Sequence, residues 1–179
     1  MKNIGFGDSN FQIAVYIANR PAMYEYQNLD YVLPLVGGEI ASINQACGNG
    51  WRKVFNVYAK VLFALDKAQF EFSKHTKTWQ TYRDKYLLQG QDSTALLFSA
   101  PELISGKNKL HIICGKGHAK TLINSEQLVA ELEWLDDEFA ISRNNNLIVC
   151  PYFDYRQLSN IKIERLATLI KTLQFNLSP

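Results

Sequence analysis

The segment LHIICGKGHAKT, residues 110–121, joins a short apolar run to a glycine-containing turn and then to a helical sequence. This change of pattern is typical of a β-strand that passes through a tight turn into an α-helix. Glycines at such a turn let the backbone approach a ligand, and the N-terminus of the following helix favours an anion. The alternative is a tight turn without a ligand, because glycine is the usual residue wherever backbone geometry is tight.

Three other apolar runs lie near residues 12–18, 94–99 and 147–152, and they alternate with amphipathic stretches. Alternation of strands and helices is typical of a parallel sheet that is covered on both faces. We therefore expect an α/β fold of three layers, α/β/α, with a central, mainly parallel four-stranded sheet. One domain is expected to span residues 1–179.

Apolar side chains recur at three- and four-residue spacing between the expected strands, which indicates helices with one buried face. The clearest case begins at Trp51 and continues through Val54, Phe55 and Tyr58. Helical structure is expected at residues 29–36, 39–47, 51–65, 74–89, 117–135 (with Ser125 as an internal N-cap) and 159–173.

The composition limits the possible classes of protein. The chain has 179 residues and a net charge of +2, which predicts neither a strongly basic nucleic-acid surface nor an acidic tail. No apolar run has the length of a transmembrane helix, and the first ten residues lack the apolar stretch of a secretory signal. We expect a cytoplasmic protein with no membrane partner, and the oligomeric state stays open.

The cysteines, Cys47, Cys114 and Cys150, are odd in number and widely spaced. This spacing fits neither a disulfide framework nor a zinc site, and a reduced cytoplasmic protein is the default. The histidines have no neighbouring carboxylate or cysteine at the spacing of metal ligands. The sequence therefore predicts neither a metal nor another cofactor.

Each expected strand ends in a polar or aromatic turn. The four turns are Ala18–Pro21, Phe98–Pro101, Gly115–His118 and Tyr152–Arg156. Because open α/β sheets bind ligands outside the carboxyl ends of their strands, we expect a site where these turns meet. Arginine offers a forked donor to phosphate, and aromatic rings offer stacking faces to bases. The candidate ligand-binding residues are Arg20, Ser99, Lys116, Gly117, His118, Tyr152, Tyr155 and Arg156.

The order of these motifs resembles that of the uracil-DNA glycosylase superfamily over most of the chain, although each motif is degenerate. The matching segments are Ile17–Pro21, Arg52–Leu62, Leu96–Ser99, Ile112–Ala119 and Asp154–Ser159. The resemblance implies the fold of these enzymes, with the site at the carboxyl edge of the sheet.

The resemblance also implies catalytic candidates. A family member activates water with an aspartate or asparagine of the first motif and supports the departing base with a histidine of the last. Asn19 or Arg20 stands in the first place, and Asp154 or Tyr152 stands in the second. Arginine does not act as a base, which leaves Asn19 and Asp154 as candidates. Ser99 replaces the asparagine that reads the base and could still form a hydrogen bond to a ligand. Ordinary uracil excision is not expected, because Arg20 and the Asp154 region replace the groups that make the water and the leaving group reactive.

Three interpretations follow. The first is a glycosylase-like protein with altered chemistry that binds a nucleic acid, a nucleotide or another anionic ligand. The second is an active hydrolase of an N-glycosidic or related bond, with Asn19 or Asp154 handling water. The third is a structural or regulatory protein that acts through an oligomer and has no ligand site. A base-stacking pocket with a basic rim would separate the first interpretation from the third, and a short contact from a carboxylate to a candidate reacting atom would separate the second from the first.

Overall fold

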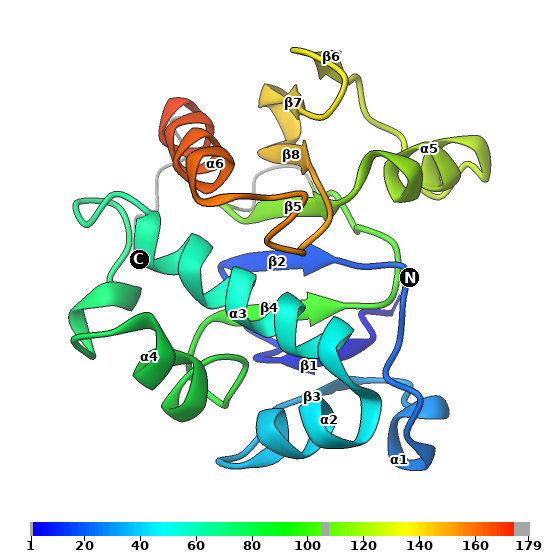
Figure 1. Ribbon diagram of the computed structural model, residues 1–179. Coiled ribbons are helices and arrows are strands. Elements are labelled where there is room, and N and C mark those ends of the chain that lie inside the picture. The colour runs from blue at the N-terminus through cyan, green and yellow to red at the C-terminus, as the bar shows by residue number, and fades with distance from the viewer. Residues whose placement is uncertain (1, 105–107, 174–179) are drawn as a thin grey trace.

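The computed structural model describes residues 2–104 and 108–173, and these form one eight-stranded sheet with helices packed against it (Figure 1). The strand order is β3-β1-β4-β2-β5-β8-β7-β6. The middle strands are β4 (Thr94–Leu97), β2 (Ile13–Tyr16), β5 (Leu110–Cys114) and β8 (Leu147–Cys150). Each of these is parallel to its neighbours within the group, which confirms the four expected strands and their direction.

The sheet is larger than expected, and it is mixed. Strand β1 (Gly5–Gly7) runs antiparallel to β4, and β3 (Val32–Leu33) extends the sheet beyond β1. At the other side, β7 (Ala140–Ser142) runs antiparallel to β8, and β6 (Glu133–Trp134) lies at the edge. The expectation of four strands was wrong because the four flanking strands are only two or three residues long, too short for a periodic pattern.

Strand β1 depends on two glycines. A Cβ atom at Gly5 would lie 2.2 Å from the carbonyl oxygen of Leu96, and one at Gly7 would lie 2.2 Å from that of Thr94. Gly7 also has a φ of +120°, which side chains rarely adopt. Glycine is depleted in strands, so the same residues that let β1 approach β4 hide the strand from a propensity argument.

One face of the sheet carries most of the helices. Here α2 (Glu39–Cys47), α3 (Asn49–Ala64), α4 (Trp79–Lys85) and α6 (Asn160–Thr172) cover Ile13, Val15, Ile112 and Ile148. Two short elements complete this layer, α1 (Tyr24–Gln27) and the 3₁₀ turn η1 (Phe72–Lys74). Figure 1 is viewed from this side, with α3 in front of the sheet.

The opposite face has a thinner cover. Helix α5 (Lys116–Asn124) and the segment around Leu128 pack against Ala14, Tyr16 and Val149. The sheet is therefore covered on both faces, as expected for an α/β protein. A short 3₁₀ turn, η2 (Arg143–Asn145), joins β7 to β8.

Three of the expected helices differ from the structure. Helix α5 ends at Asn124, where Ser125 is the C-cap and Glu126 takes a left-handed φ of +60°. The chain then runs to β6, so the observed helix is only about half as long as the helix expected over residues 117–135. Residues 29–36 contain β3 rather than a helix.

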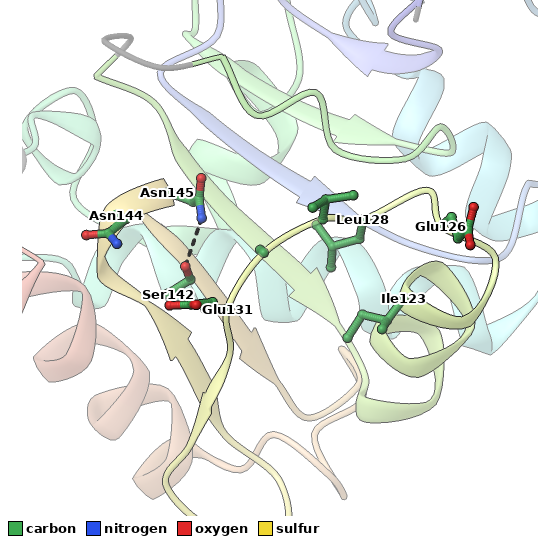
Figure 2. A pocket seen from close by; sticks show the side chains of 9 residues that line it. Ile123, Glu126, Leu128, Glu131, Ser142, Asn144 and Asn145 are labelled. Carbon is green, nitrogen blue, oxygen red and sulfur yellow. Dashed lines mark hydrogen bonds between the residues drawn. The ribbon is translucent and has the colours of Figure 1, made fainter.

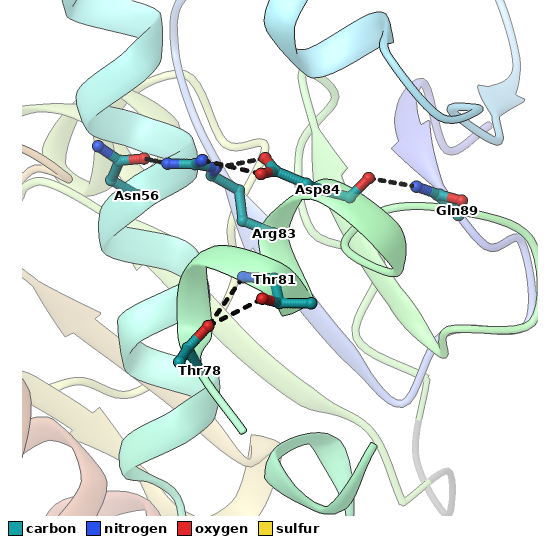
Figure 3. A network of polar contacts seen from close by, with 6 residues as sticks. All are labelled: Asn56, Thr78, Thr81, Arg83, Asp84 and Gln89. Carbon is teal, nitrogen blue, oxygen red and sulfur yellow. Dashed lines mark hydrogen bonds and ion pairs between the residues drawn. The ribbon is translucent and has the colours of Figure 1, made fainter. Parts of the chain in front are cut away.

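The stretch 74–89 contains only the seven-residue helix α4. Thr78 begins it by accepting a hydrogen bond from the Thr81 N–H at 3.2 Å. Arg83 then donates to Asn56 Oδ1 of α3 at 2.6 Å and pairs with Asp84 (Figure 3). This network fixes the short helix α4 against the long helix α3.

His111 and the partly buried Asp92 have pKa values that are shifted by burial. The Tyr16 hydroxyl and His111 Nδ1 are 2.7 Å apart, and burial lowers the pKa of His111 to about 4. The carboxylate of Asp92 accepts hydrogen bonds from the hydroxyls of Tyr82 and Thr94, each at 2.6 Å. Burial nevertheless raises the pKa of Asp92 to about 6.

Within the residues that the structure describes, none of the helices has both the length and the apolar character needed to cross a lipid bilayer.

Candidate ligand-binding site

The parallel strands bring several chain segments to the carboxyl edge of the sheet, around a pocket of about 480 Å³. Its walls come from the ends of β2, β5 and β8 and from the turn between β6 and β7. The residues that line it are Ala18, Asn19, Cys114, Gly115, Lys116, Gly117, His118, Asp137, Glu138, Pro151, Tyr152 and Gln157. Five of the ten candidate residues line this pocket, namely Asn19, Lys116, Gly117, His118 and Tyr152.

The N-terminus of α5 opens this pocket. Gly115 has a φ of +101°, and it caps the helix without a side chain. The Ala119 N–H bonds to the Gly115 carbonyl, whereas the backbone N–H groups of residues 116–118 have no acceptor in the described part of the chain. Free N–H groups at a helix start attract anions. The glycine turn of residues 115–118 therefore exposes N–H donors at the pocket.

Two side chains of this first turn add to the site. Lys116 holds its ammonium 5.3 Å from the centre of the Trp134 ring, and no carboxylate pairs with it in the described residues. His118 is partly buried, and its Nε2 atom is shielded from water without a hydrogen-bond partner. Burial lowers the pKa of His118, so its imidazole is neutral at pH 7.

Asn19 and Tyr152 meet across the end of β5. The Asn19 amide donates to the Tyr152 hydroxyl at 3.1 Å. Burial raises the pKa of Tyr152, which keeps its hydroxyl protonated and able to donate in turn. The side chain of Tyr152 also lies about 4.0 Å from the position of a Cβ atom on Gly115. A Cβ atom at Gly115 would therefore be in ordinary contact with the tyrosine, and it is the φ of +101° that favours glycine at this position.

Asp154, a candidate for handling water, is bound by cations instead. Its carboxylate accepts from Arg156 at 2.9 Å and from Lys53 of α3 at 3.1 Å. The hydrogen bonds from Arg156, together with Lys53, hold the pKa of Asp154 well below its usual range. A carboxylate so stabilised is a weak base, so Asp154 fixes the loop after β8 to α3.

The remaining candidates lie away from the pocket lining. Arg20 donates to the carbonyls of Tyr26, Gln27 and Leu29 at 2.9–3.1 Å, which closes the end of α1. Ser99 accepts from the Ile4 N–H at 3.0 Å and so holds the chain before β1. Tyr155 and Arg156 are exposed beside the Lys53–Asp154 pair.

Sequence reasoning missed Asp137, Glu138 and Gln157, which also line the pocket. Asp137 and Glu138 lie in the turn between β6 and β7, within a stretch expected to follow a long helix. The signal was the acidic run Asp136-Asp137-Glu138 directly before an apolar stretch. This run is far from the glycine turn in the sequence, and it reaches the same pocket only because β7 pairs with β8.

A larger groove of about 740 Å³ lies beneath the end of α5 (Figure 2). Leu128 and Ile123 form its apolar side, and Asn145 donates to Ser142 at its other side. Its charged lining residues are Glu126 and Glu131, and no basic residue lines it among those described. Its chemistry does not suit an anion, unlike that of the pocket at the carboxyl edge.

The comparisons with known proteins give a family and no activity. Residues 4–171 match the model of a family described as "Family of unknown function (DUF6942)". The chain belongs to this family. No curated protein and no solved structure shows a significant match. The function of this DUF6942 member therefore has to be argued from the pocket itself.

Proposed function

We propose that the protein binds a small anionic ligand at the carboxyl edge of its sheet, and that this ligand is a nucleotide or the end of a short single-stranded nucleic acid. The observation that carries the proposal is the N-terminus of α5, which exposes unbonded N–H groups and Lys116 in the pocket. A phosphate group fits such a place because N–H groups, the helix dipole and the ammonium all favour negative charge.

The rest of the pocket suits a planar group attached to that phosphate. Tyr152 contributes an aromatic ring to the wall, and aromatic rings stack on bases of any sequence. The Asn19 amide uses one donor on Tyr152, which leaves its carbonyl oxygen for a ligand. The volume of about 480 Å³ lies in the range typical of small-molecule sites.

The glycosylase-like order of motifs supports the same class of ligand. Under this proposal the protein is a distant relative of uracil-DNA glycosylases that keeps a base-binding edge and has changed its chemistry. Hydrolysis is the weaker alternative, because the paired carboxylate of Asp154 is a poor base. With a net charge of +2, we expect a local contact with the ligand rather than a long track for duplex DNA.

Calorimetric titration tests the proposal. Mononucleotides and short single-stranded oligonucleotides should bind wild-type protein, with an affinity that falls as salt rises. Lys116→Ala should weaken binding about five- to tenfold through loss of one phosphate contact. Lys120→Ala is the matched control, since Lys120 is an exposed lysine of α5 that does not line the pocket. Absence of binding at low salt, or equal effects of both substitutions, would contradict the proposal.

A further inference from the structure

The turn between β6 and β7 contains three consecutive acidic residues, Asp136, Asp137 and Glu138. Helix α6 forms ion pairs with the first and the third of them. Arg165 of α6 pairs with Asp136 and also lies 4.5 Å from the Phe139 ring centre. Lys162 of α6 pairs with Glu138 at 2.7 Å. Helix α6 therefore holds the turn from both sides.

The middle carboxylate is left free by this arrangement. Asp137 is exposed, has no hydrogen-bond or ion-pair partner among the described residues, and lines the pocket at the carboxyl edge. Asp136 further stiffens the turn, because its carboxylate accepts the N–H groups of Glu138 and Phe139, each at 2.8 Å. Asp137, whose carboxylate is free, therefore lines the pocket from a turn that is fixed in place.

A free carboxylate disfavours an anionic ligand unless the ligand also donates a hydrogen bond to that carboxylate. Negative charge on the ligand and on Asp137 would repel each other in one pocket. The cost disappears when the ligand directs N–H donors at the carboxylate, because hydrogen bonds to a charged group are the strong ones. The lining therefore contains two groups of opposite preference, the helix start for an anion and Asp137 for a hydrogen-bond donor.

We propose that the pocket selects nucleotides whose base carries an exocyclic amino group, with Asp137 as the acceptor for that group. This inference rests on the proposed function and adds the specificity of the same site. A base with an oxo group in the same place would turn an acceptor toward the carboxylate and be rejected.

Two pairs of ligands test this group. AMP and IMP differ by the exchange of the exocyclic amino group of the purine for an oxo group, and CMP and UMP differ in the same way in the pyrimidine; in each oxo base the adjacent ring nitrogen also carries a proton. Calorimetric titration of wild-type protein should give about tenfold tighter binding of AMP than of IMP, and of CMP than of UMP. The Asp137→Asn variant should bring both ratios within about twofold of one, because an amide both donates and accepts.

Glu131→Gln serves as the control for the loss of one negative charge. Glu131 belongs to the segment before β6 and lines the groove under α5 instead of the pocket. Its ratios should equal those of the wild type, and circular dichroism should show the same fold for all three proteins. Equal binding of amino and oxo ligands to the wild type, or a preference that persists in Asp137→Asn, would overturn the inference while the proposed function stands. Binding of none of the four nucleotides would overturn the proposed function and the inference together.

Discussion

The Asn19 amide nitrogen lies 3.1 Å from the hydroxyl oxygen of Tyr152, although the two residues follow strands that are not neighbours in the sheet. Strand β5 separates β2 from β8, so the contact bridges the end of β5 just above the glycine turn. The pair therefore ties together the two sides of the pocket, and it gives a first test of which group serves the ligand.

Substitutions of this pair should separate stacking from hydrogen bonding. Tyr152→Phe keeps the ring and should lower nucleotide affinity by less than about threefold, whereas Tyr152→Ala should lower it about tenfold through loss of stacking. Asn19→Ala should lower affinity more than Tyr152→Phe does, because it also removes the carbonyl oxygen that is left for the ligand. The double variant Asn19→Ala/Tyr152→Phe should lose little more than Asn19→Ala alone, because Tyr152→Phe removes only the hydrogen bond that Asn19→Ala has already removed. Additive losses measured by calorimetry would mean that each residue contacts the ligand independently.

The ion pairs of Asp154 should matter for folding more than for chemistry. Asp154→Ala leaves Lys53 without its partner in a site where the lysine side chain is 16% exposed. We expect a loss of about 2 kcal/mol in the free energy of unfolding, measured by urea denaturation. Arg156→Ala should cost less, since its side chain is 68% exposed. Equal stability of wild type and Asp154→Ala would mean that the loop after β8 is held by other contacts.

Asp92 and His111 should make the free energy of unfolding depend on pH in opposite directions. Asp92 has a pKa raised to about 6, so its contribution to stability is complete in acid and is lost as pH rises from about 4 through 6. His111 has a pKa lowered to about 4, so its contribution is complete above about pH 6.5 and is lost as pH falls. Each contribution amounts to about 3 kcal/mol at most.

Unfolding free energies at several pH values would separate the two groups. Relative to wild type, Asp92→Asn should become more stable as pH rises from 4 to 6, and His111→Asn should become more stable as pH falls over the same range. In the wild type the two slopes largely cancel between these values. Curves that run parallel to the wild type would show that neither group has a shifted pKa.

Uracil excision should be absent. Incubation with single- and double-stranded oligonucleotides that contain uracil should release no base, because Asp154 is held by cations and Arg20 is bonded to the carbonyls at the end of α1. Gel analysis after alkaline cleavage of abasic sites provides the measurement. Release of uracil that Asn19→Ala abolishes would favour the hydrolase interpretation instead.

The central half of the fold could be predicted, for a physical reason. Strands such as residues 147–150 are buried on both faces, so they are continuous apolar runs that stand out from their surroundings. The flanking strands lack this signal. Gly5 and Gly7 form a strand because of close approach to β4, and Glu133 and Trp134 are exposed at an edge.

The pocket was predictable in part for the same reason. Gly117 and Tyr152 follow the long runs directly, so the strand ends located them. Asp137 comes from a hairpin whose place depends on the pairing of β7 with β8 and on the ion pairs of α6. Arg20 was a reasonable candidate by charge, yet nearby carbonyls accept its hydrogen bonds, and a sequence carries no mark of such a local partner.

The strand order has a consequence for synthesis on the ribosome. Strand β1 pairs with β3 and β4, so it has both neighbours only when the chain is made as far as residue 97, and β2 pairs with β4 and β5, so it has both only at residue 114. Strand β2, with its apolar run, has no partner strand until β4 is made, when more than half of the protein has been translated. Non-local pairing of this kind slows folding and leaves strand edges open to association. Nascent chains stalled before β5 should therefore be the species that depend most on chaperones.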